Sequence, residues 1–554
     1  MHCTYTAPSR KSKPKKRQSN AKIEESTSDT QARLRYLETL LEQVTERLEA
    51  AERRNEVQDK AQLRGPKPTA TVTLSTMPTS EDGNADDDDD SPKSISLPPL
   101  QQVLPVVQIF LQKFNAVLPL FHADTLLHLV HDFYHRGPQK RRDPVAWGAI
   151  NIVLALAHRQ GLAGSSNTKY YAECFSRAQS VLSAVTLGNI ELLNIQVLVG
   201  MVMLSQSSQD LQPSLILLAM TMRLAHKLGL HNRASSAHLD PVLARQRTRV
   251  FWLAYILDKD LSMRSKQPSI QLDDDIDLDL PSPKFAATER QVGGDDDDDD
   301  ADGVGAGIIT TADGAAKMNY FVARIQLAVV EGGVYDYLYS TRSQKRSPKE
   351  RSRALESVAS ALERWKASNP PEFSAAAALR GVSPDTLRFL CVLHSTSLLC
   401  TTAISQAHAW NAQWVASLRR HGREGTVPLL PPHWEVIVDE ARDLMVLLSA
   451  LRLTDRWNFW KMGCTYMTAM ILLTANSMHR PRHEKISFDS QLVASGLQTI
   501  DTMVEEMESE ALRSFRGTCA ELNQEVQRRS RGEATMKANH RDFFLYFSDA
   551  QSGI

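Results

Sequence analysis

The side chains that could bind a metal, carry redox chemistry or attack a substrate are scattered along this chain of 554 residues. Its cysteines are Cys3, Cys174, Cys391, Cys400, Cys464 and Cys519. No two of them have CxxC spacing and no secretory signal precedes them, so a disulfide framework is not expected. Cys391 and Cys400 would lie on opposite faces of one helix. We therefore expect free thiols in a reducing compartment.

Motifs for catalysis do not occur in the sequence. There is no GxSxG nucleophile elbow, no HExxH zinc site and no GxxxxGK[ST] phosphate loop. Gly303, Gly305 and Gly307 neither follow a predicted strand nor have the spacing of a dinucleotide fingerprint. Because no residue stands out as a nucleophile, we expect the protein not to be an enzyme.

Asp273, Asp275, Asp277 and Asp279 alternate in a way that could provide calcium ligands. An EF-hand loop also needs a glycine at its sixth position and a terminal glutamate, and both are missing here. We predict a solvated loop that caps a helical domain.

Three arginines precede an aromatic cluster in one segment: Arg245, Arg247 and Arg249, then Phe251, Trp252 and Tyr255. The arginines could form a DNA-contacting face, but the aromatic rings beside them demand burial. We predict structural cations that pair with carboxylates around a buried helix.

Two further groups of residues are predicted to be structural. His231 follows a helix end, where an imidazolium interacts favourably with the helix dipole. No second ligand stands at metal spacing from it. Trp457, Phe459 and Trp460 fall at helical steps, and core packing is the prediction for them. An effector pocket lined by these three rings is the alternative.

A compact basic cluster marks the first 22 residues, which contain no acid. Its members are Arg10, Lys11, Lys13, Lys15, Lys16 and Arg17. Clusters of this kind direct nuclear import or contact phosphates, in a way that weakens with salt. A solvated basic tail is the alternative.

A short heptad seam follows within residues 30–56. Its apolar residues are Leu34, Leu37, Leu41, Val44 and Leu48, at steps of three and four. This spacing predicts a short dimerisation coiled coil. A surface helix packed on its own chain is the alternative, because the seam spans only about two and a half heptads.

The remaining chain separates into acidic linkers and an apolar body. The formal net charge of -1 averages unlike segments, since Asp runs occupy 86–90 and 295–300. Residues 61–99 predict a disordered acidic linker, and residues 285–316 predict an acidic Gly/Asp-rich insertion loop. Residues 481–554 are expected to be partly disordered.

Helical periodicity dominates the body. Helical patterns cover 144–157, 169–185, 192–204, 213–228, 241–263, 318–339, 349–366, 384–409, 433–451 and 456–475. No alternating strand pattern lies between them, so we predict an all-α fold with a core over 100–284 that continues over 317–480. The longest apolar runs are too short to span a bilayer, so we expect a soluble intracellular protein without a membrane partner.

The segment 224–281 is the most informative part of the body. Gly229 stands where a left-handed helix cap is usual, and Asp240 and Pro241 predict the next helix start. Val250 and Leu253 then begin an apolar face at helical steps.

Three parts of the chain together resemble the fungal binuclear zinc-cluster transcription factors. Cys3, the basic cluster and the coiled coil resemble the last ligand, linker and dimerisation helix of that family. Phe110 to Phe121, with LPLFH at 118–122, is similar to the opening of its middle homology domain. The most specific part matches the signature of that domain, through Gly229, His231, Arg247, Arg249, Phe251, Trp252, Tyr255, Asp258, Pro268 and Pro281.

The resemblance implies a nuclear regulator of RNA polymerase II genes. It implies phosphate contacts by the basic cluster and a homodimer or a heterodimer with related factors. The family binds zinc through six cysteines, of which residues 1–22 would keep only Cys3. Zinc is thus expected only if an upstream segment supplies the others, and this form is expected to bind DNA weakly and without specificity. Lys266 and Gln267 replace the glycine and arginine of the family before Pro268.

Three hypotheses follow for function. The first is a transcription regulator of this family with an all-α regulatory domain. The second is an interaction protein without DNA binding, which dimerises with relatives or senses an effector. The third, an α-helical enzyme, is supported by no residue.

Overall fold

The computed structural model of the protein describes residues 97–135, 143–159, 168–206, 210–281, 306–409, 430, 433–451, 456–480, 482–507 and 510–530. The chain divides into two units, Met1–Ser91 and Pro92–Ile554, and every described residue belongs to the second. Cys3, the basic cluster and the predicted coiled coil therefore lie outside the described residues. Their roles remain predictions.

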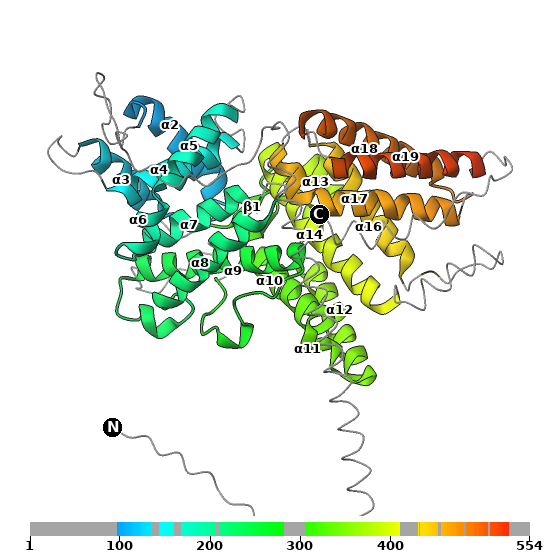
Figure 1. Ribbon diagram of the computed structural model, residues 1–554, viewed down its shortest axis with the longest axis horizontal. Helices are drawn as coiled ribbons and strands as arrows, with labels where there is room; N and C mark the ends of the chain where they lie inside the picture. Colours follow the sequence, from blue (N-terminus) through cyan, green and yellow to red (C-terminus); the bar gives the residue numbers. More distant parts are fainter. Residues whose placement is uncertain are drawn as a thin grey trace, which may run out of the picture. The chain divides into compact units, whose positions relative to one another are not determined.

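Helices from the first part of the second unit surround one apolar core (Figure 1). They are α2 (Leu100–Phe110), α3 (Ala123–His135), α4 (Pro144–Arg159), α5 (Thr168–Ser180), α6 (Leu182–Leu187), α7 (Leu192–Ser205), α8 (Gln212–Lys227) and α9 (Pro241–Ser265). The π-helical turn η1 (Leu111–Asn115) extends α2, and the short 3₁₀ turns η2 (Arg233–Ser236) and η3 (Asp273–Asp275) flank α9.

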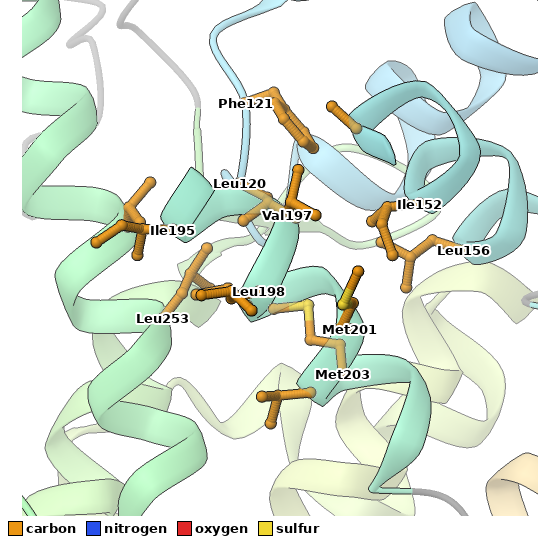
Figure 2. Close-up of a cluster of buried hydrophobic side chains, with 14 of the residues drawn as sticks. Leu120, Phe121, Ile152, Leu156, Ile195, Val197, Leu198, Met201, Met203 and Leu253 are labelled. Carbon is orange, nitrogen blue, oxygen red and sulfur yellow. The ribbon is translucent and has the colours of Figure 1, made fainter. Parts of the chain in front are cut away.

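Helix α7 lies at the centre of this first core and is buried from Asn194 to Ser205. A helix that is apolar around its whole circumference can only be stable when other helices cover every face. Figure 2 shows Ile195 and Leu198 near Leu253 of α9, Val197 near Leu120 and Phe121, and Met201 near Ile152 and Leu156 of α4. Gly200 lets α7 approach α4, because a Cβ there would overlap the Cγ2 methyl of Ile152.

A second apolar core forms from the rest of the described chain. It begins with the antiparallel strands β1 (Ile308–Thr310) and β2 (Lys317–Asn319), in which Ile309 pairs with Met318. The helical elements that follow are α10 (Tyr320–Val334), η4 (Tyr335–Tyr339), α11 (Thr341–Gln344), α12 (Pro348–Ser368), η5 (Pro371–Phe373), α13 (Ala375–Gly381), α14 (Pro384–Ala409), α16 (Trp434–Ser449), α17 (Arg456–His479), α18 (Ile486–Met507) and α19 (Glu510–Ser530).

Helix α10 belongs to both cores. Phe321, Ile325 and Ala328 recur on one face and pack in the first core. Leu327 and Val330 lie on another face and pack in the second core. Since α10 also packs along α9, these two helices join the two cores.

One helix of the described chain, α14, is long and apolar enough to cross a bilayer by length and composition. Its apolar window is 67% buried inside the protein, as expected for the central helix of a core. The sequence reasoning had pointed to shorter apolar runs and had not singled out α14.

The all-α prediction is confirmed, and the helical patterns fall within observed helices to within a few residues. The structure adds elements that the pattern did not indicate, namely the β1–β2 hairpin and the helices α11, α13, α18 and α19. Strand β1 lies at the end of the segment predicted as an insertion loop, and α18 and α19 lie in the segment predicted as partly disordered.

Candidate functional site

The caps of the signature segment are as predicted. Gly229 ends α8 with a φ of 69°, which is the left-handed conformation that favours glycine. Asp240 caps α9, because its Oδ2 accepts hydrogen bonds from the backbone N–H groups of Val242 at 3.0 Å and Leu243 at 3.3 Å. Pro241 takes the first helical position.

The aromatic residues of the signature lie inside the first core. Phe251, Trp252 and Tyr255 are all buried, with ring centroids 5.3 to 6.4 Å apart. The polar atoms of two rings reach the segment that follows α9. Trp252 Nε1 donates to the carbonyl oxygen of Asp279 at 3.3 Å, and Tyr255 Oη donates to Asp273 Oδ1 at 2.8 Å.

Residues 266–281, here called the strap, run back along α9 and are held by two of its charged side chains. Asp258 accepts hydrogen bonds from the backbone N–H of Ile270 at 2.9 Å and of Gln271 at 2.9 Å. Burial raises the pKa of Asp258, whereas these hydrogen bonds act in the opposite direction. The signature aspartate therefore fixes the backbone of the strap.

Lys259 of α9 also holds the strap against this helix, and its side chain is buried. Its Nζ donates to the Oγ of Ser269 at 3.0 Å and to the carbonyl oxygen of Gln271 at 2.7 Å. It also forms an ion pair with Asp273 Oδ1 at 2.9 Å. Gly332 of α10 faces this lysine, and a Cβ there would lie 3.2 Å from Lys259 Cδ. The lysine thus links the strap to the contact between α9 and α10.

Among the arginines before the aromatic cluster, Arg247 has structural contacts whose partners differ from the prediction. Arg247 Nε donates to Ser236 Oγ at 2.8 Å, and its Nη2 donates to the carbonyl oxygen of Leu228 at 2.6 Å. The predicted partners were carboxylates, and the partners found for Arg247 are a hydroxyl and a helix-end carbonyl. Such carbonyls lack an intrahelical donor, so a cation satisfies them well.

The acidic loop caps the domain. Asp273 forms an ion pair with Lys259 and accepts a hydrogen bond from Tyr255. Asp279 forms an ion pair with Arg233 at 2.9 Å. Among the described residues, no three His, Cys, Asp or Glu side chains come together to hold a metal ion. The zinc that the family resemblance implies therefore has no ligand set in that part of the chain.

The remaining signature residues shape the two ends of the strap. Lys266 adopts the left-handed conformation, with a φ of 56°, directly before Gln267 and Pro268. The carbonyl oxygen of His231 accepts from the N–H of Asp277 at 3.0 Å. The imidazole of His231 packs edge-on against His226, with centroids 5.1 Å apart. The side chains of Trp457, Phe459 and Trp460 lie outside the described residues.

A small cavity lies where the two cores meet, with a volume of about 50 Å³. Its apolar wall includes Phe114 from η1, Tyr320 from α10 and Phe389 from α14. The ring of Phe389 lies 6.2 Å from that of Phe114 and 5.4 Å from that of Tyr320. Its polar lining consists of Gln206, Asp260, Arg324, Arg388 and Lys461.

A loose ion pair adjoins this cavity. Arg324 Nη1 lies 3.6 Å from Glu331 Oε2, and their side chains are 4% and 0% exposed. Neither that Nη1 nor either carboxylate oxygen of Glu331 has a hydrogen-bond partner. Burial raises the pKa of Glu331 to about 8, and burial lowers the pKa of Lys461 to about 8.

Sequence reasoning missed these cavity residues. Arg324 and Glu331 are lone charged residues within the apolar helix α10, and that isolation was the available signal. Buried charges without close partners destabilise a fold and often mark function. Their convergence with Lys461 could not be predicted, because it depends on how α10 and α17 both pack against α14.

The fold and the strap point to one class of protein, a helical regulatory domain. Its signature residues have a structural role, because they hold the strap against α9. Residues 107–367 match the family described as fungal specific transcription factor domain. These residues carry the middle homology domain that is found in fungal zinc-cluster-type transcription regulators.

Relatives named as transcription factors support this assignment. The chain is 31% identical over 440 residues to an "ABC-transporter-regulating transcription factor" of Aspergillus oryzae, covering 78% of this chain and 47% of the relative. It is 30% identical to a protein of the same name from Aspergillus fumigatus, covering 77% and 46%. It is 23% identical to the "Fusaridione A cluster transcription factor fsdR" of Fusarium heterosporum, covering 77% of each chain. The chain thus spans about half the length of the two Aspergillus relatives.

Proposed function

We propose that the protein regulates transcription in the nucleus, with residues 97–530 acting as its regulatory domain. The observation that carries the proposal is the strap on α9. Its fasteners, Asp258, Tyr255 and Trp252, are signature residues, and all three bind the strap instead of forming a catalytic group. The match over residues 107–367 and the names of the relatives support the same class.

A tethering experiment tests this function apart from DNA binding. The full chain is fused to a heterologous DNA-binding domain, and a reporter gene with the matching site is measured in a fungal host. We expect a change of at least about fivefold in reporter output, in either direction. The matched fusion with Trp252→Ala should lose the effect, because removal of a buried aromatic costs about 3–5 kcal/mol. Unchanged output from a stable, nuclear wild-type fusion would exclude the proposal.

Contact with DNA phosphates is proposed for the basic cluster of residues 10–17. Each phosphate neutralised contributes about -0.9 to the slope of log affinity against log salt. Replacing Lys13, Lys15 and Lys16 with Gln should therefore reduce that slope by about 3. The control replaces the exposed residues Lys349, Arg351 and Arg353 of α12, which removes equal charge. An equal effect of both triple variants would argue against a specific role for the cluster.

Zinc binding is proposed only where further cysteines join Cys3, since a structural zinc site takes four ligands. Metal analysis of the purified chain, with and without additional upstream sequence, measures this directly.

The identity of the regulated genes can also be proposed. Two relatives at 30–31% identity are named for regulating ABC transporters. We therefore propose that the targets include transporter genes of that class. Transcript levels in a deletion strain test this, and unchanged transporter transcripts beside other altered genes would overturn only this refinement.

The second hypothesis, a partner protein without DNA binding, is less well supported because the relatives are named as transcription factors. It predicts that promoter association requires a DNA-binding relative. Chromatin immunoprecipitation from a strain lacking such relatives separates the two hypotheses.

A further inference from the structure

We propose that the cavity between the two cores binds a small carboxylate, which bridges α9, α10, α14 and α17. The proposal rests on the proposed function only for its regulatory consequence. The binding itself is argued from charge, hydrogen-bonding capacity and size.

The charge of the cavity favours an anion. Arg324, Arg388 and Lys461 line it from three different helices, together with the carboxylate of Asp260, and Arg388 also lies 3.8 Å from Asp385. The nearby carboxyl of Glu331 adds little negative charge at pH 7, because burial raises its pKa to about 8, and burial also lowers the pKa of Lys461 to about 8. A carboxylate in the cavity would lie among these three cationic side chains.

An unsatisfied donor identifies where the carboxylate would bind. Arg324 is almost fully buried and lines the cavity, yet its Nη1 has no hydrogen-bond acceptor. The oxygen of Glu331 at 3.6 Å is too distant to accept. Buried polar groups are nearly always paired, so an absent acceptor indicates a bound group. A carboxylate fits a guanidinium better than a spherical anion does, because the two form parallel hydrogen bonds.

The size and walls of the cavity limit the ligand. A group the size of a water molecule needs about 10–15 Å³ of cavity volume, so a cavity of about 50 Å³ holds about four such groups. Acetate has four non-hydrogen atoms. Phe114, Tyr320 and Phe389 provide an apolar wall for its methyl group. We therefore assign a short-chain monocarboxylate to this site.

A ligand at this position would tie the two cores together. Asp260 and Arg324 come from the helices that join the cores, and Lys461 comes from α17 of the second core. Occupancy would hence favour the packed arrangement of α9, α10 and α17. This gives the regulatory domain a means to respond to a small acid.

Binding to the purified full chain is measured by calorimetry and by thermal unfolding, with sodium acetate as probe. Sodium chloride at equal ionic strength and acetamide, its neutral analogue, are the controls. We expect a saturable rise in melting temperature with acetate alone. The dissociation constant should be no tighter than about 0.05 mM, given the limit on affinity per atom for a ligand of four atoms.

Two variants make the test specific. Arg324→Gln should weaken acetate binding at least tenfold by removing the charged donor. Val392→Leu fills the cavity, so it should abolish binding while leaving the unliganded melting temperature unchanged or higher. Arg516→Gln, which breaks an ion pair of Arg516 with Asp501 elsewhere, should bind like the wild type.

Three results would overturn the proposal: no response to acetate beyond that to chloride, an equal response to acetamide, or unaltered binding by Val392→Leu. The outcome is independent of the tethered reporter. Absent binding with an active reporter rejects only the ligand, and binding with an inactive reporter rejects only the transcriptional function.

Discussion

Lys266 holds a backbone conformation that favours glycine, at the point where α9 ends and the strap begins. Its φ of 56° places a side chain in the left-handed region, while the N–H of Gln267 bonds back to the carbonyl oxygen of Ser262. The family resemblance had already marked this position, because Lys266 stands where the resemblance implies a glycine. The turn is formed by a lysine with a positive φ, and strain is the consequence.

Replacing Lys266 with glycine should therefore stabilise the protein, by about 0.5–1 kcal/mol. Chemical denaturation measures the change. The control is Arg223→Gly, at an exposed position inside α8, where a glycine should destabilise by about 1 kcal/mol. Destabilisation by both would show that the left-handed lysine carries no strain.

Glu331 gives the fold a dependence on pH. Burial raises the pKa of Glu331 to about 8 in the folded protein, above its ordinary value of 4.5 in an unfolded chain. The folded state thus binds more protons between these values, and stability should fall as pH rises, by up to about 1.4 kcal/mol per pH unit. Glu331→Gln stays neutral and should flatten this dependence.

Urea unfolding at several pH values between 5.5 and 8.5 checks this expectation. Glu363→Gln, at an exposed surface pair on α12, is the control and should leave the slope as in the wild type. A Glu331→Gln variant that is less stable than the wild type throughout this range would mean that the carboxylate is ionised against Arg324.

At the scale of the elements, close packing of α7 on α4 depends on a residue without a side chain. A methyl group at Gly200 would overlap Ile152, so Gly200→Ala should destabilise by about 1–3 kcal/mol. Helix propensity alone predicts a gain of up to about 1 kcal/mol. Gly517→Ala in α19 meets no atom within 4 Å and should show that gain. Thermal unfolding of both variants decides between packing and propensity.

The strap should become more mobile when Asp258, which binds its backbone, loses its charge. Asp258→Asn keeps the shape but removes the charge and replaces one of the two oxygens that accept from the backbone N–H groups of Ile270 and Gln271 with an NH2 donor. We expect amide exchange over residues 268–276 to accelerate at least tenfold by mass spectrometry. Asp274→Asn, an exposed neighbour in the same strap, should leave exchange unchanged.

Much of the element level follows from local sequence rules. The start of α9 was predictable because Asp240 and Pro241 form a cap that needs no tertiary contact. The three-residue strands β1 and β2 are too short for an alternating pattern. Val493, Ile500 and Met503 do give α18 a buried helical face, so that helix could have been found. The cavity could not have been found from the sequence, because Asp260 and Lys461 come together only through long-range packing.

At the scale of the whole molecule, α10 ties the two cores together, and the N-terminal segment is predicted to tie two chains together. Residues 34–48 carry the heptad seam, for which the dimer remains a prediction. Leu37→Pro with Leu41→Pro should convert a dimer of the full chain into a monomer, because proline breaks a helix interior. Sedimentation velocity measures the mass.

The matched control places two prolines in the predicted linker, by Thr71→Pro with Thr73→Pro, and should leave the dimer intact. A monomeric wild type would contradict the predicted coiled coil. A dimer that survives both pairs of prolines would place the contact in the helical body.

The meeting of Asp260 and Lys461 also has a consequence for synthesis on the ribosome. About 200 residues separate them, and a ribosome adding about 5–20 residues per second needs about 10–40 s for that interval. The first core is complete well before α17 emerges, so Asp260 and Arg324 stay hydrated while they wait. Removing that water from several charges at once makes the docking of the two halves a late and slow step. A nascent chain that stops between α14 and α17 would expose this unfinished polar seam to chaperones.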